Sequence, residues 1–155
     1  MPKAIELRMG QLGVWRLELD DRADRTVALR PETWTAGTPA SPCVRWATVT
    51  PIALDRHTKG EDKWKAIEET LARGCVRIGL PEPTAIIPSA VSMFIGAPHA
   101  GSFSPIVRKS DGGRILHTHA IITFPEPVIG PVILGAGRYR GYGFCRAYRP
   151  EEVLT

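Results

Sequence analysis

The chain has 155 residues, of which 43% are hydrophobic, and a net charge of +4. This length suits one folded domain, or one domain with an appendage. The sequence has no apolar run of the length that a membrane-spanning helix needs. Its three cysteines lack C-x-x-C spacing, which excludes zinc-ribbon and thioredoxin-type sites, and their odd number argues against a secreted disulfide framework. We therefore expect a cytoplasmic protein with no cofactor.

The N-terminal part predicts a small extension. Two short runs of alternating apolar residues around Gly10 and Gly13 predict a β-hairpin within residues 4–19. Residues 20–45 are charged and then rich in Pro, Thr, Ser and Gly, which is typical of a linker. We expect residues 1–40 to form a strand or hairpin extension with its linker, and residues 41–150 to form the principal domain.

The principal domain begins with a predicted strand and helix. Residues 46–54 favour a strand that is broken, or placed at a sheet edge, at Pro51. Thr58 and Glu61 fit a capping box at the start of a helix, and Gly74 is a reasonable end. Between them apolar residues recur at helical spacing, namely Trp64, Ile67, Leu71 and Cys75. This stripe predicts a helix that packs on a sheet.

The second half predicts three further strands. Residues 84–87 favour a strand, and a long loop rich in Pro and Gly follows it to residue 113. Residues 114–124 alternate strictly, with His117 and His119 on one face. Prolines within residues 125–134 limit any helix there to a short one, and residues 143–148 predict a last strand. The order predicts an α+β, ferredoxin-like (RRM-like) βαββαβ domain.

A glycine-rich loop precedes the last strand and forms its own motif. Its glycines can let the backbone approach a ligand closely, at Gly135, Gly137, Gly141 and Gly143. Arg138 and Arg140 offer guanidinium forks to phosphate, and Tyr139 offers a ring for stacking. Neither a dinucleotide-binding G-x-G-x-x-G nor a Walker loop is present. We predict that this loop binds an RNA backbone, and the alternative is a tight turn.

Three segments resemble the RAMP superfamily of CRISPR-associated RNA-binding proteins. They are residues 46–57, 77–83 and 117–143, the last of which joins a His-x-His strand to the glycine loop. Within the superfamily they are most similar to the C-terminal, Cas six-like half of the type I-U (I-G) Cas five–Cas six fusion proteins. Those proteins carry a further N-terminal RAMP domain, which this chain is too short to hold.

The resemblance implies an endoribonuclease that cuts precursor CRISPR RNA within the repeat without a metal. The ribose 2′-hydroxyl attacks the adjacent phosphate and leaves a 2′,3′-cyclic phosphate. The enzyme is then expected to stay bound as a subunit of a type I interference complex, with a Cas five-like RAMP domain among its partners. The alternative is a non-catalytic RNA-binding subunit that caps one end of the guide RNA in that complex.

The histidines are the candidates for proton transfer. Such a cleavage needs a base, an acid and a cation, and histidine suits the first two roles because its pKa is near neutrality. We expect His57 to be catalytic, with Arg56 binding RNA and Lys59 stabilising charge beside it; an exposed loop histidine is the alternative. His117 and His119 could act together as base and acid.

Two other interpretations of the histidine pair stay open. It could simply line a polar sheet face, or it could chelate a metal completed by His57 or His99. The metal site is disfavoured because no suitably spaced Cys, Asp or Glu accompanies it.

A basic turn completes the predicted RNA-binding set. Residues 111–113 predict a hairpin turn, and Arg108, Lys109 and Arg114 bracket it. We expect these three side chains to grip the RNA repeat, and the alternative is a solvated turn.

Overall fold

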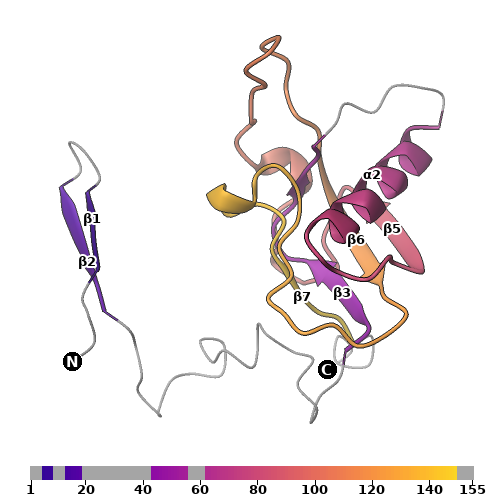
Figure 1. The fold of residues 1–155 in the computed structure, drawn as a ribbon. Coiled ribbons are helices and arrows are strands. Elements are labelled where there is room, and N and C mark those ends of the chain that lie inside the picture. The colour runs from indigo at the N-terminus through magenta and orange to yellow at the C-terminus, as the bar shows by residue number, and fades with distance from the viewer. Residues whose placement is uncertain (1–4, 9–12, 19–42, 56–61, 150–155) are drawn as a thin grey trace. The chain divides into compact units, whose positions relative to one another are not determined.

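The computed structural model describes residues 5–8, 13–18, 43–55 and 62–149 (Figure 1). It divides the chain into two units, Met1–Arg30 and Pro31–Thr155, each of which is described by itself. The first unit holds an antiparallel hairpin of β1 (Ile5–Arg8) and β2 (Val14–Leu17), which confirms the hairpin predicted within residues 4–19. The predicted boundary at residue 40 lies outside the described residues.

The described part of the second unit is a β-sheet with helix α2 packed on one face (Figure 1). Its elements are β3 (Arg45–Thr48), β4 (Ile52–Ala53), α2 (Lys63–Arg77), β5 (Ala85–Ser89), β6 (His117–Thr123) and β7 (Cys145–Ala147). Strand β6 pairs antiparallel with β5 on one side and with β3 and β4 on the other, and β3 pairs antiparallel with β7. If β3 and β4 are counted as one interrupted strand, the strands lie side by side in the order β7, β3/β4, β6, β5. In chain order these are the last, first, third and second strands, which is the ferredoxin-like arrangement.

The interruption between β3 and β4 is the break that the sequence predicts. Trp46 of β3 pairs with Ile122, and Ile52 of β4 pairs with Thr118. Between them lies Pro51, which has no N–H group to donate to a ladder. The break leaves both halves of the strand bonded to β6.

Helix α2 begins and ends later than predicted. Its N-cap is Asp62, whose side chain accepts a hydrogen bond from the Lys65 N–H at 3.1 Å; the predicted capping box lies outside the described residues. Gly74 lies within the helix. The helix ends before Gly79, whose φ of 86° is the left-handed conformation that favours glycine after a helix. The predicted core position of Trp64 is also wrong, because the buried stripe begins one turn later and leaves Trp64 49% exposed.

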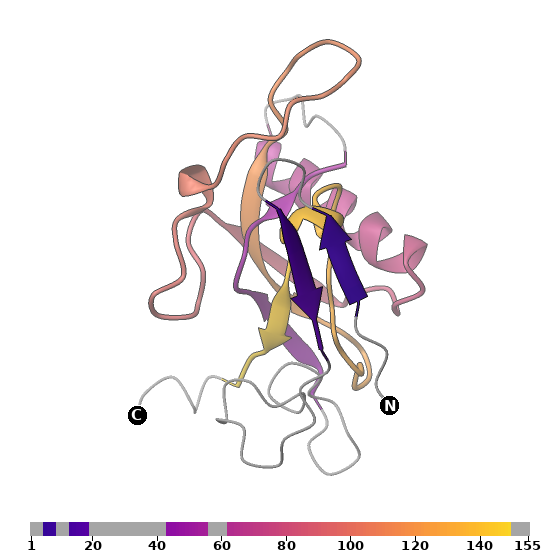
Figure 2. The same ribbon diagram turned by 90° about the vertical axis from the view of Figure 1, so that its left-hand side faces the viewer.

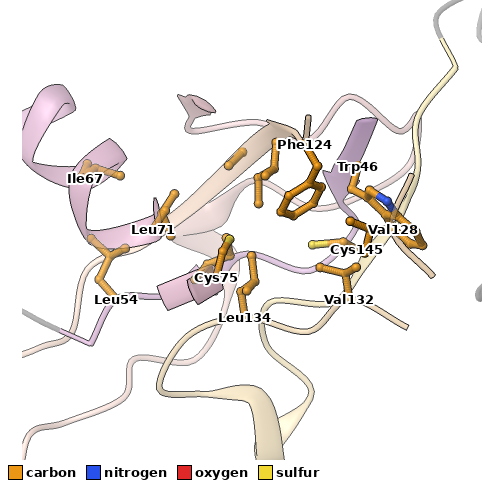
Figure 3. Close-up of a cluster of buried hydrophobic side chains, with 13 residues drawn as sticks. Trp46, Leu54, Ile67, Leu71, Cys75, Phe124, Val128, Val132, Leu134 and Cys145 are labelled. Atoms are coloured by element: carbon orange, nitrogen blue, oxygen red, sulfur yellow. The ribbon is translucent and has the colours of Figure 1, made fainter. Parts of the chain in front are cut away.

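The core lies between the sheet, the helix and the chain that follows β6 (Figure 3). The predicted short helix within residues 125–134 is absent, and all of these residues are described. Prolines in this stretch lack the N–H groups that a helix requires. The chain instead runs without helical turns and buries Val128, Val132 and Leu134 against the sheet. A 3₁₀ turn, η4 (Arg138–Arg140), follows within the glycine loop.

Among the residues that the structure describes, none of the helices is sufficiently long and apolar to pass through a membrane.

Candidate functional site

The two histidines of β6 lie on the face of the sheet opposite helix α2. Their neighbours Ala120 and Ile122 belong to the core on the helix side, so strand alternation turns His117 and His119 the other way. This confirms the predicted alternation. The loop after β5 is hydrogen-bonded to the sheet near them. The Ser92 hydroxyl donates a hydrogen bond to the Thr48 carbonyl oxygen of β3 at 2.5 Å.

His119 is buried and both of its ring nitrogens are engaged. Its exposed fraction is 1%. Nε2 lies 3.0 Å from the Pro98 carbonyl oxygen, which can only accept, so Nε2 carries the proton and donates it. Nδ1 is then an acceptor, and it lies 2.9 Å from the Thr48 hydroxyl, which donates to it. The oxygen of this hydroxyl accepts from the Ala120 N–H at 3.0 Å. The neutral ring satisfies every partner, and burial lowers the pKa of His119 below its ordinary value.

His117 has a different environment at the start of the same strand. It is half-buried, and its ring centroid lies 5.0 Å from that of Tyr142 in the glycine loop. Its Nε2 atom is buried and has no hydrogen-bond partner among the described residues. Burial lowers the pKa of His117, and the backbone of Ala100 opposes this shift. Burial thus favours the neutral imidazole of His117, and its Nε2 makes no hydrogen bond to the described residues, so this ring could exchange a proton.

An open cleft of about 530 Å³ lies beside His117. Its walls come from the start of α2, from the loop around residues 100–105, and from the chain that enters β6. The residues that line it are Lys63, Ala100, Gly101, Phe103, Pro105, Arg114, Ile115, Leu116 and His117. They include two cations and one imidazole, and none is a carboxylate. Such a cleft suits an anionic ligand, and its imidazole could exchange a proton with that ligand.

Lys63 is the cleft residue that sequence reasoning missed. It is the first residue of α2, next to the Asp62 cap. The absence of an acidic residue in the first helical turn is the signal that could have found it, because acidic side chains usually favour that turn. Arg114, which was predicted to bind RNA, is brought into the same cleft by the chain entering β6.

Two glycines of the loop, Gly135 and Gly143, are explained by packing of the chain against itself. A Cβ added at Gly135 would overlap the Ala53 carbonyl oxygen of β4, and one at Gly143 would overlap the Leu134 carbonyl oxygen. Both glycines also have positive φ angles, 86° and 70°. Close backbone packing therefore accounts for these two positions. Their contact with RNA stays a prediction.

The polar side chains of the loop are the exposed part. Arg138, Tyr139 and Arg140 form η4, and Tyr139 is 87% exposed. The Arg138 guanidinium lies 4.8 Å from the centroid of the Tyr139 ring. An arginine stacked on an exposed ring offers donors for a phosphate beside a surface for a base.

The predicted basic turn is present and projects from the domain (Figure 2, orange loop at the top). Val107 and Arg114 form a bridge across it, and Gly112 has a φ of 69°. Arg108 makes two 2.9 Å contacts with the Asp111 carboxylate, so part of its donor fork is already occupied. Lys109 is exposed at the tip.

His57, Lys59 and Arg56 lie outside the described residues. His99 is exposed, and its Nδ1 accepts a hydrogen bond from the Gly101 N–H at 2.9 Å. Within the described ranges, His, Cys, Asp and Glu do not gather in groups of three or more that could hold a metal ion.

The fold and the cleft define a ferredoxin-like α+β protein with a basic, histidine-containing cleft. Residues 4–147 match the model of a family described as CRISPR-associated protein, GSU0054 family. The chain belongs to this family, and its function is therefore CRISPR-related. Neither the curated proteins nor the solved structures include a match to this chain.

Proposed function

We propose that this protein is a metal-independent endoribonuclease that cuts precursor CRISPR RNA within the repeat. The 2′-hydroxyl loses its proton and attacks the adjacent phosphorus, and the bond from phosphorus to the 5′-oxygen breaks. The products are a 2′,3′-cyclic phosphate and a 5′-hydroxyl, so no water is consumed. The observation that carries this proposal is that His117 lines a cleft together with Lys63 and Arg114, with no carboxylate among the described residues of the lining.

Each of these side chains has a role that its chemistry supports. The unused nitrogen of His117 would take a proton from the 2′-hydroxyl or give one to the leaving oxygen. Lys63 and Arg114 would stabilise the negative charge that grows on the phosphorane. His57 lies six residues before Lys63 in the sequence and is the candidate for the second proton transfer, with Lys59 beside it.

His119 serves this site as a positioning residue. It binds the Pro98 carbonyl and thereby fixes the loop that continues into the cleft wall at Ala100 and Gly101. The Tyr142 hydroxyl fixes the same loop further along by donating to the Ser104 carbonyl. The site therefore divides into a reacting histidine, His117, and a histidine that shapes the wall.

After cleavage the protein would keep its product and become a subunit of a type I interference complex beside a Cas five-like RAMP domain. The exposed Arg138, Tyr139 and Arg140, together with Lys109 at the tip of the turn, would hold the RNA.

A non-catalytic subunit that caps one end of the guide RNA is the second candidate. The burial of His117 Nε2 favours it, because a buried nitrogen reaches a 2′-hydroxyl only after a local movement. The basic cleft and loop would then bind RNA without cutting it.

Labelled CRISPR repeat RNA incubated with the protein in EDTA separates the candidates. We expect a product that ends in a 2′,3′-cyclic phosphate, and no cutting of a control RNA with a 2′-deoxyribose at the cleavage position. Binding without cleavage would refute the nuclease proposal in favour of the capping subunit. Cleavage that EDTA abolishes and Mg²⁺ restores would show a metal-dependent nuclease instead.

A further inference from the structure

We infer that Trp64 is a stacking platform for an unpaired RNA base next to the phosphate that the cleft binds. This inference rests on the proposed function, since it names a contact that the RNA would make. Trp64 is 49% exposed on the first turn of α2, whereas Ile67, Leu71 and Cys75 of the same helix are buried. A tryptophan side chain of which half remains in water has apolar area still to bury.

The position of Lys63 connects this ring to the cleft. Lys63 lines the cleft together with Arg114 and His117. Its Nζ atom also lies 5.9 Å from the centroid of the Trp64 ring. Lys63 therefore lines the cleft and also places its ammonium group near the aromatic ring. A cation beside a ring matches a nucleotide, which carries a phosphate and a flat base on one sugar.

The charges around Trp64 favour a nucleic-acid ligand over an apolar partner. Both sequence neighbours of Trp64 are lysines, Lys63 and Lys65, and both are exposed. The nearby Asp62 carboxylate keeps its charge at the helix N-terminus, where it accepts the hydrogen bond that caps the helix. A purely apolar protein surface would have to desolvate these lysines, whereas an RNA strand pairs with them. The base is expected to be unpaired, because bases in a duplex keep their faces stacked on one another.

The test uses a nine-nucleotide oligouridylate that carries one central 2-aminopurine, in EDTA, with cleavage prevented by 2′-O-methyl groups. Fluorescence anisotropy gives the affinity, and quenching of the 2-aminopurine reports stacking. We compare the wild type with Trp64→Phe, Trp64→Leu and Trp64→Ala. Unfolding curves check that the variants are folded, which is expected because Trp64 is half-exposed.

We expect Trp64→Ala to weaken binding about tenfold and to reduce the quenching, because stacking on an aromatic ring contributes about that much per base. Trp64→Phe should keep most of both signals and Trp64→Leu should lose them, since leucine is apolar but has no aromatic face. The slope of affinity against salt should stay unchanged, because no phosphate contact is removed. Lys63→Ala is the matched control and should lower that slope.

Equal affinity and quenching for the wild type and Trp64→Ala, in a protein that still binds and cuts RNA, would overturn this inference alone. A Trp64→Leu variant that binds like the wild type would replace base stacking by simple apolar contact and overturn it as well. If the wild type bound neither this oligonucleotide nor CRISPR repeat RNA, both the proposed function and this inference would fail.

Discussion

At the scale of single residues, two histidines two positions apart on one strand have different chemistry because their surroundings differ. His119 is enclosed and uses Nδ1 and Nε2 in hydrogen bonds that suit its neutral form. His117 faces the cleft and keeps Nε2 without a partner among the described side chains and backbone groups. The sequence predicts that the two rings share a face, but it cannot tell which ring the loop from residue 90 onward will enclose.

The enclosure of His119 predicts an effect on stability. Replacing it by Phe removes both hydrogen bonds, one of which engages the buried Thr48 hydroxyl. We expect the free energy of unfolding, measured with urea, to fall by about 1–3 kcal/mol, the usual cost of one unsatisfied buried group. His119→Gln should recover part of the loss, because its amide can donate to Pro98. An unchanged urea midpoint for His119→Phe would contradict this role.

The lowered pKa of His119 also predicts how the free energy of unfolding of the wild type changes with pH. Since the pKa of His119 is lower in the folded state, the unfolded chain binds more protons near and below the ordinary value of 6.5. Stability should therefore fall as the pH falls below about 6.5, and the fall should be shallower in His119→Gln. His99→Gln should also make the fall slightly shallower, because the charge of His99 helps to lower the pKa of His119. Parallel curves for the wild type and His119→Gln would contradict this prediction.

Among the structural elements, the glycine loop has a composition that fits two explanations, contact with a phosphate and close packing of the backbone. Glycines and arginines together predict a loop that embraces a phosphate. The structure instead explains Gly135 and Gly143 by the close approach of the loop to β4 and to residue 134. Contact with RNA is then left to the exposed Arg138, Tyr139 and Arg140.

Alanine substitutions at two glycines test this division. Gly143 and Gly141 have similar φ angles of 70° and 82°, so both lose stability through backbone strain of about 1 kcal/mol. Only the Cβ at Gly143 meets another atom, the Leu134 carbonyl oxygen, whereas that at Gly141 has nothing within 4 Å. Gly143→Ala should therefore lower the melting temperature clearly more than Gly141→Ala. Equal losses would show that close packing is not the reason for Gly143.

At the scale of the whole molecule, the sequence predicts the sheet well and the cleft poorly. Alternation and the position of Pro51 are local signals, so the strands and their ferredoxin-like order follow from them. The start of α2 is not predicted correctly, because more than one residue could cap the helix. The second helix is predicted but absent, because the prolines of that stretch disfavour it. The cleft joins Lys63, the loop near residue 100 and the start of β6. Such an assembly depends on tertiary packing, which no local pattern encodes.

The proposed nuclease activity depends on His117 as the reacting group of the cleft. Single-turnover cleavage of repeat RNA in EDTA tests this most directly, with wild type, His117→Ala and the control His99→Ala compared for rate and for RNA affinity. We predict that His117→Ala slows the cleavage step about 10²–10⁴-fold, with RNA affinity nearly unchanged and with His99→Ala close to the wild type. A His117→Ala protein that cuts RNA at the wild-type rate would contradict the assignment, and a His57→Ala protein that alone loses cleavage would move the reacting group to His57.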